Sequence, residues 1–213
     1  MHDVYRRWSG YRDDSREIAV SDAPVTAFKK ALQHLAERIR SRRTVNLFLQ
    51  QPVSRQLILD AIEVARWAPN HHLTEPWHFY CLGDEAIQQS IELTRIVVTE
   101  RKGANIGDFK AKEAAARPGW LVVTCKKSSD EQLEQEDYAS VCCAIQNLSL
   151  YISEAGLASK WATGPITRDA RFYDLLKIDR NKEFIVALVW YGYPKITPTQ
   201  QRKDVAEIVT ETD

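Results

Sequence analysis

The most constraining feature of this sequence is a pair of almost wholly apolar runs, at residues 121–123 and 184–189. Neither run alternates apolar and polar residues, as a strand with one face in water does. Such runs are typical of strands that are covered on both faces. A chain that contains two of them needs helices on either side of a central sheet. We therefore predict an α+β (mixed α/β) fold in which helices sandwich the sheet.

The other elements are predicted from composition and spacing. Strands are expected at residues 77–82, 120–125, 157–163 and 184–191. Helices are expected at residues 22–40 and 54–67, and near 84–101, 108–117, 136–155 and 168–177. Ser54 is an expected N-cap, Pro69 disfavours helix before it, and Gly156 suits the C′ position. These elements predict one domain at residues 22–213 after an N-terminal extension at residues 1–21.

The charge of the chain is balanced, with 29 Lys and Arg residues against 29 Asp and Glu residues. The balance argues against broad binding to nucleic acid or to an anionic membrane. No apolar run reaches about 18 residues, so no membrane span is expected. The four cysteines form no C-x-x-C pair and lie in predicted strands or helices. We expect buried free thiols in a reducing cytoplasm.

A basic cluster, Arg42-Arg43-Thr44, stands at the end of the first predicted helix. Two guanidinium groups and a hydroxyl match a phosphate dianion, because Arg gives bidentate, charge-assisted bonds. The alternative is a solvated basic helix end, where cations complement the carboxyl terminus of the helix.

A polar loop with two prolines lies between the second predicted helix and the first strand. It contains His71, His72 and Glu75, and His78 follows on the strand. These residues invite a zinc interpretation, but the helical H-E-x-x-H geometry is required and Pro76 excludes a helix here. We therefore predict no metal site, and a ligand-binding loop instead.

The segment at residues 156–165 predicts the end of a long helix, a short strand and a Gly-Pro turn. Gly164 has no side chain, so the backbone N–H groups of this turn can approach a planar ring closely. The alternative is an ordinary connection between a helix, a strand and a turn.

The order and spacing of these motifs resemble the nitroreductase family over about residues 35–205. The family typically shows an Arg-x-Ser start, an x-Pro-Val helix and a Trp-Ala-Pro loop that closes on Gln-Pro-Trp. The matching residues here are Arg42-Arg43-Thr44, Gln51-Pro52-Val53, Trp67-Ala68-Pro69 and Glu75-Pro76-Trp77. A Gly156-Leu157 join and a strand that ends Tyr191-Gly192-Tyr193-Pro194 follow.

The resemblance implies an FMN site at the interface of a homodimer, with a C-terminal tail that packs on the partner. It assigns Arg42, Arg43 and Thr44 to the phosphate and ribityl chain, and Arg202 to a second phosphate contact. Trp67 and His71 match loop positions that reach the flavin, often that of the partner. The residues that match the strand beside the ring are Trp161, Ala162 and Thr163, with Gly164 as a backbone donor toward N5.

Several positions depart from the family pattern. Thr44 replaces the usual Ser, and Asn46, at the start of the cofactor site, stands where many members have Lys or Arg. Ala162 stands where some relatives have Arg. The remaining departures are Leu73 for Asn and Glu75 for Gln.

The implied activity is hydride transfer from NAD(P)H to an organic small molecule (a nitroaromatic, quinone or similar acceptor) by a ping-pong mechanism. The flavin carries this chemistry, so no catalytic side chain is expected. Two alternatives remain open on the same scaffold. One is a flavin-binding or flavin-sensing protein without turnover, and the other is a reductive dehalogenase or flavin-fragmenting enzyme.

Overall fold

The computed structural model describes residues 25–212, which divide into two compact units between Glu37 and Arg38. The predicted extension at residues 1–21 and the expected helix start at residues 22–24 lie outside the described residues. Helix α1 (Val25–Ser41) spans the boundary between the units. The apolar residues of its N-terminal part, Phe28, Leu32 and Leu35, are exposed.

The second unit is built around a four-stranded sheet with the order β1-β2-β4-β3. The strands are β1 (Trp77–Cys81), β2 (Gly119–Lys126), β3 (Ala158–Ala162) and β4 (Glu183–Gly192). All three pairings are antiparallel, and β3 forms one edge. The apolar runs fall on β2 and β4, the two central strands, which confirms the prediction of strands covered on both faces.

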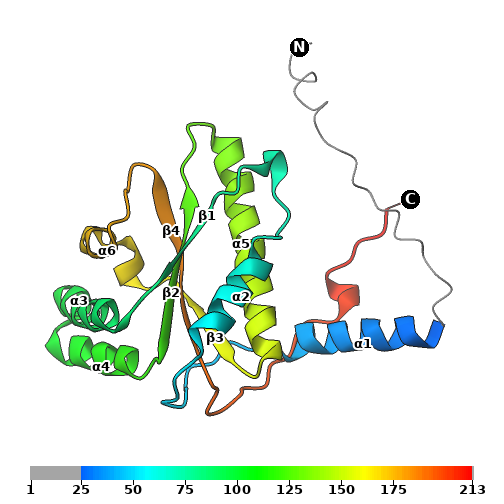
Figure 1. The fold of residues 1–213 in the computed structure, drawn as a ribbon, viewed down its shortest axis with the longest axis horizontal. Coiled ribbons are helices and arrows are strands. Elements are labelled where there is room, and N and C mark those ends of the chain that lie inside the picture. The colour runs from blue at the N-terminus through cyan, green and yellow to red at the C-terminus, as the bar shows by residue number, and fades with distance from the viewer. Residues whose placement is uncertain (1–24, 213) are drawn as a thin grey trace, which may run out of the picture. The chain divides into compact units, whose positions relative to one another are not determined.

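The two faces of the sheet carry separate cores, because side chains alternate along a strand. Leu121 and Val123 pack with helices α2 (Arg55–Ala65) and α5 (Glu131–Glu154) on one face. Trp120 and Val122 pack with α3 (Asp84–Lys102) and α6 (Ala170–Leu176) on the other. Helix α4 (Ala104–Ala115) lies beside α3 (Figure 1). The predicted sandwich is therefore confirmed.

Three helix predictions differ from the structure for local reasons. Ser54 precedes α2, but its side chain makes no capping hydrogen bond. Helix α5 begins before the predicted residue 136, because the Asp130 carboxylate accepts hydrogen bonds from the backbone N–H groups of Gln132 and Leu133. The helix expected near 168–177 is divided into η3 (Pro165–Arg168) and α6, since Asp169 caps α6. Gly156 follows α5 with a φ of 80°, as predicted for a C′ glycine.

The remaining elements are two short 3₁₀ turns, η2 (His71–Leu73) in the loop before β1 and η4 (Val205–Glu207) in the C-terminal tail. All four cysteines are free, but Cys143 is exposed rather than buried as predicted. Among the described residues no helix combines the length and the apolar character that a bilayer span requires.

Candidate functional site

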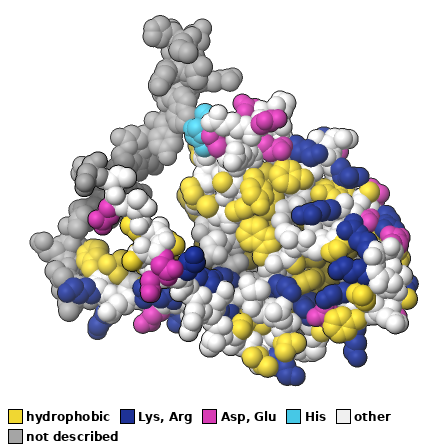
Figure 2. Space-filling view, turned by 180° about the vertical axis from the view of Figure 1, so that it is seen from behind, with side chains coloured by type: hydrophobic (Ala, Val, Ile, Leu, Met, Phe, Trp, Pro, Cys, Tyr) yellow, Lys and Arg dark blue, Asp and Glu magenta, His cyan; other side chains and the backbone are white. Residues whose placement is uncertain are grey.

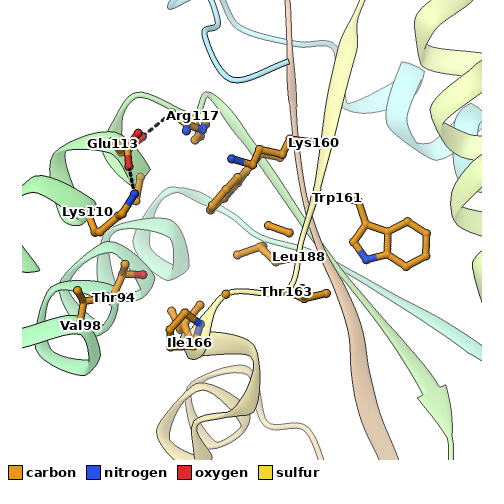
Figure 3. A pocket seen from close by; sticks show the side chains of 15 residues that line it. Thr94, Val98, Lys110, Glu113, Arg117, Lys160, Trp161, Thr163, Ile166 and Leu188 are labelled. Atoms are coloured by element: carbon orange, nitrogen blue, oxygen red, sulfur yellow. Dashed lines mark hydrogen bonds and ion pairs between the residues drawn. The ribbon is translucent and has the colours of Figure 1, made fainter. Parts of the chain in front are cut away.

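A cavity of about 440 Å³ opens where β3 ends, between the β3–β4 side of the sheet and helices α3 and α4 (Figure 3). Its size is typical of a small-molecule site. The apolar part of the wall comes from Val98, Ala114, Ile166, Leu188 and Trp190. The segment predicted to lie beside a planar ring also lines it: Trp161, Ala162, Thr163 and Gly164.

Lys160 reaches into this cavity from β3 (Figure 3). Its Nζ donates a hydrogen bond of 2.7 Å to the side-chain oxygen of Asn46, and it lies 5.4 Å from the centre of the Trp190 ring. Burial lowers the pKa of Lys160, and the charge of Arg117 lowers it further. The ammonium group of Lys160 is thus partly shielded from solvent and hydrogen-bonded to a neutral amide.

Arg117 is buried in the wall of the same cavity, with 6% of its surface exposed. It donates to the backbone oxygen of Glu113 at 2.7 Å and lies 5.0 Å from the Trp190 ring centre. Within the described chain, Arg117 Nε and Trp190 Nε1 are buried without a hydrogen-bond partner. Buried polar atoms are nearly always paired, so these two unpaired donors are a local cost in free energy in the cavity wall.

The charges around the cavity do not cancel. Lys110 and Glu113 form an ion pair at 2.6 Å on α4, which lowers the pKa of Glu113. Arg117 and Lys160 then leave an excess of positive charge in the lining. Figure 2 shows Lys and Arg side chains interspersed with apolar ones on the side of the molecule that carries α3, α4 and α6. The cavity therefore suits a planar apolar molecule with an electron-rich edge.

The end of β3 exposes backbone to the cavity. The Trp161 ring lies across β3 from Lys160, where its Nε1 donates to the Val186 oxygen at 3.3 Å (Figure 3). Gly164 has an ordinary negative φ, and a Cβ built on it would meet no atom within 4 Å. The space above Gly164 is thus open, as a close approach between backbone and ligand requires.

A second hollow, of about 210 Å³, lies at the other end of β3. Arg42, Arg43 and Ser159 line it. Burial lowers the pKa of Arg42, and the charges of Arg43 and Arg202 lower it further. Arg42 and Arg43 in the hollow, with the charge of Arg202 acting on Arg42, concentrate positive charge that suits an anion.

The two hollows are adjacent along one strand. Ser159 lines the anion hollow and Lys160 the large cavity. Thr44 forms an isolated parallel bridge with Ser159, and the N–H of Val45 donates to the Ser159 oxygen at 3.2 Å. The structure thus brings Thr44 and Asn46 beside Ser159 and Lys160 of β3, and their assignment to a cofactor site stays a prediction.

Trp67 and His71 line neither of these two hollows. Trp67 is 74% exposed, and His71 Nδ1 lies 2.8 Å from a carboxylate oxygen of Glu136. Their loop has an unusual backbone, with positive φ at His72, Leu73 and Glu75. Such φ values are rare outside glycine. The loop therefore presents both side chains outward from this chain.

The histidine-rich loop does not assemble the set considered for zinc. His71 and His72 approach Glu136, with ligand atoms within 4.8 Å of one another, whereas Glu75 and His78 are not in the group. The two imidazole rings are stacked at 3.8 Å. His71 Nδ1 is already paired with the Glu136 carboxylate at 2.8 Å, and we assign no metal here.

Sequence reasoning missed Lys160, Arg117 and Glu113. The available signal for Lys160 was that it is the only charged residue in the short strand Ala158–Ala162. Arg117 directly precedes Pro118 and the buried strand β2, which was a weaker signal.

The model of the nitroreductase family matches residues 39–193. A Bacillus subtilis (strain 168) protein, YfhC, whose name assigns it provisionally to the NAD(P)H nitroreductases, is 31% identical over 182 residues, which cover 83% of this chain and 93% of that protein.

Solved structures share the fold. A nitroreductase-like family protein from Bacillus cereus superposes with a TM-score of 0.75 and 26% identity, covering 84% of this chain and 96% of that one. An iodotyrosine deiodinase, bound to FMN and 3-iodo-L-tyrosine, has a TM-score of 0.65 and 21% identity, with 84% and 98% covered.

Proposed function

Because the chain belongs to the nitroreductase family, we propose that it is an FMN-dependent oxidoreductase that transfers hydride from NAD(P)H to an organic acceptor, such as a nitroaromatic compound or a quinone. The observation that carries this proposal is the pair of adjacent hollows along β3. One concentrates guanidinium groups and the other combines apolar walls with excess positive charge. A phosphate joined to a large planar ring has this combination of properties.

The residues that line both hollows fit FMN. A phosphate dianion would relieve the repulsion among Arg42, Arg43 and Arg202. The Arg117 and Lys160 side chains line the large cavity, where their positive charges can face ring oxygens or nitrogens. The deiodinase that shares this fold was solved with FMN bound, which supports the same assignment.

The protein would bind and orient, while bound FMN supplies the hydride-transfer chemistry. Arg42, Arg43, Thr44 and Arg202 would hold the phosphate and ribityl chain. The backbone along Trp161, Ala162, Thr163 and Gly164 would support the ring and leave one face open. Donor and acceptor would use this face in turn, which is a ping-pong mechanism.

We further propose that the working form is a homodimer. Trp67 and His71 point outward and can reach the site of a second copy. The tail from residue 195 on exposes four aliphatic side chains, Ile196, Val205, Ile208 and Val209. Exposed apolar surface of this kind is typical of a segment that packs on a partner. Free thiols fit a reducing cytoplasmic setting.

Reductive dehalogenation is the second candidate, since the deiodinase structure has the same fold. Anaerobic mixing with NADH or NADPH distinguishes these possibilities. We expect the flavin absorbance to bleach, and then to return when a nitroaromatic or quinone is added. Recovery only with a halogenated phenol would favour the dehalogenase. A flavin that neither nucleotide bleaches would contradict the proposed hydride transfer and favour a flavin-binding protein without turnover.

A further inference from the structure

We propose that Lys160 is the residue that provides positive charge at the electron-rich edge of the bound flavin, and that Asn46 positions its ammonium group. This inference rests on the proposed function, because it concerns the same FMN site. It adds a residue that neither the motifs nor the comparisons assign.

The geometry of Lys160 carries the inference. Its Nζ is fixed from two sides, by the hydrogen bond of 2.7 Å to Asn46 and by the Trp190 ring at 5.4 Å. Figure 3 shows the Lys160 side chain directed into the cavity, on the same side of β3 as Arg117. The lining of this cavity continues along the chain to Gly164. A lysine has three donor hydrogens, so the bond to Asn46 leaves donors for a ligand.

The neighbouring charges are engaged in other ways. Lys110 is paired with Glu113 at 2.6 Å, and Arg117 is directed to the Glu113 backbone oxygen at 2.7 Å. Lys160 is instead hydrogen-bonded to a neutral amide. Burial disfavours its charge, which lowers the pKa of Lys160. An ammonium group held here without a carboxylate hydrogen bond is stabilised when negative charge enters the cavity.

The reaction creates that charge. Bound FMN would supply the hydride-transfer chemistry: a hydride carries two electrons and one proton, so its transfer would leave one more positive charge on the nicotinamide and one more negative charge on the flavin. Lys160 keeps its proton and stabilises this charge electrostatically. Asn46 stands where many relatives have Lys or Arg, and Ala162 stands where some have Arg. Lys160 therefore supplies, from another position in the chain, the positive charge that those two neutral residues lack.

The test measures the ratio of the protein's affinities for reduced and oxidised FMN. The shift of the midpoint potential from that of free FMN gives this ratio, and a separate titration gives the dissociation constant of oxidised FMN. Lys160→Met should lower this ratio about tenfold, which is about 30 mV for a two-electron couple. The double variant Asn46→Lys/Lys160→Met should recover most of the ratio, because it returns a cation to the same place. Lys112→Met, on the exposed side of α4, is the matched control and should not change it.

Lys160→Gln provides a second neutral variant, so that a folding defect in one variant does not decide the result. Wild type that binds FMN, with ratios in both neutral variants within twofold of it, would overturn the role of Lys160 and leave the proposed function intact. Wild type that binds no FMN would overturn both.

Discussion

The Arg117 guanidinium group lies 5.0 Å from the centre of the Trp190 ring, and each residue keeps one buried nitrogen without an acceptor in the described chain. A buried donor without a partner costs free energy whether or not the cavity is filled. The Arg117 side chain also lines the large cavity, so its charge can act on a molecule bound there. Removing the cation should affect the loaded protein more than the empty one.

Arg117→Met tests this link, because methionine keeps much of the apolar stem. We expect FMN affinity to fall about tenfold or more, as for loss of a hydrogen bond from a charged donor. The melting temperature without FMN should change less, since the variant also loses a buried charge. Thermal melts across an FMN titration measure both quantities. Arg101→Met, on the exposed last turn of α3, is the control. Equal FMN affinity in wild type and variant would separate Arg117 from the site.

Arg42→Ala tests the anion hollow. A charge-assisted hydrogen bond to a phosphate is worth roughly 1.5–3 kcal/mol, so FMN affinity should fall about ten- to a hundredfold. Riboflavin, which lacks the phosphate, should bind wild type and variant almost equally. Arg40→Ala removes an exposed charge from the last turn of α1, two residues before Arg42, and serves as the control. Unchanged FMN affinity would leave Arg42 as a solvated helix-end charge.

The fold was largely predictable because its two central strands have a clear sequence signal, an uninterrupted apolar run. Residues 121–123 and 184–189 are apolar at every position, and the structure covers both faces of these strands. Helix starts were less predictable, since they depend on single caps such as Asp130 and Asp169 rather than on a repeating pattern.

The site was predicted only in part, for a topological reason. Arg42 and Gly164 belong to motifs that can be seen along the chain. Lys160 and Asn46 are 114 positions apart and meet only because the segment after α1 pairs with β3. A local sequence pattern does not show which distant residues come into contact. The position of the Lys160 charge at the cavity edge could therefore be found only from the structure.

Gly119 lies so close to the Tyr191 ring that there is no room for a side chain at this position. It pairs with Tyr191 across β2 and β4, and a Cβ added to it would overlap the Tyr191 ring. Gly119→Ala should therefore lower the free energy of unfolding by about 1–3 kcal/mol, as overpacking in a core does. Gly83→Ala is the matched control, because a Cβ there meets no atom within 4 Å. Chemical denaturation of both variants checks this, and an undisturbed Gly119→Ala would mean that the ring can move aside.

The Asp169 carboxylate caps α6 and is hydrogen-bonded by Arg171, whose guanidinium group also pairs with Glu100 at 2.8 Å. Arg171 holds the pKa of Asp169 below its ordinary value. A lowered carboxyl pKa contributes stability above the unfolded-state pKa of about 3.9, and this contribution is lost as pH falls through the folded-state pKa.

Asp169→Asn keeps an acceptor at the N-cap but loses the charge beside Arg171, so it should cost roughly 0.2–1 kcal/mol at neutral pH, and the difference from wild type should shrink below about pH 4. Urea denaturation over a pH series measures it. The exposed Asp108→Asn is the control. A difference that stays constant to low pH would assign the effect to packing instead of charge.

Mixing two defective chains tests whether the flavin site is shared between subunits. Arg42→Ala should impair the phosphate hollow within its own chain, whereas His71→Ala should impair the site of the partner, because His71 points outward and lines neither hollow described here. In a heterodimer of the two variants, one site then carries both changes and the other carries none. Random exchange of subunits gives hetero- and homodimers in statistical proportion, so about a quarter of all sites should be intact.

We expect about a quarter of the sites in the refolded mixture to bind FMN with wild-type affinity, although neither variant alone has any site with that affinity. Trp67→Ala in place of His71→Ala should give the same pattern. Each variant refolded separately and then combined without exchange provides the control. A mixture that binds FMN only as weakly as the two variants alone would show that His71 acts within its own chain, and wild-type affinity in His71→Ala alone would show that His71 has no part in the site.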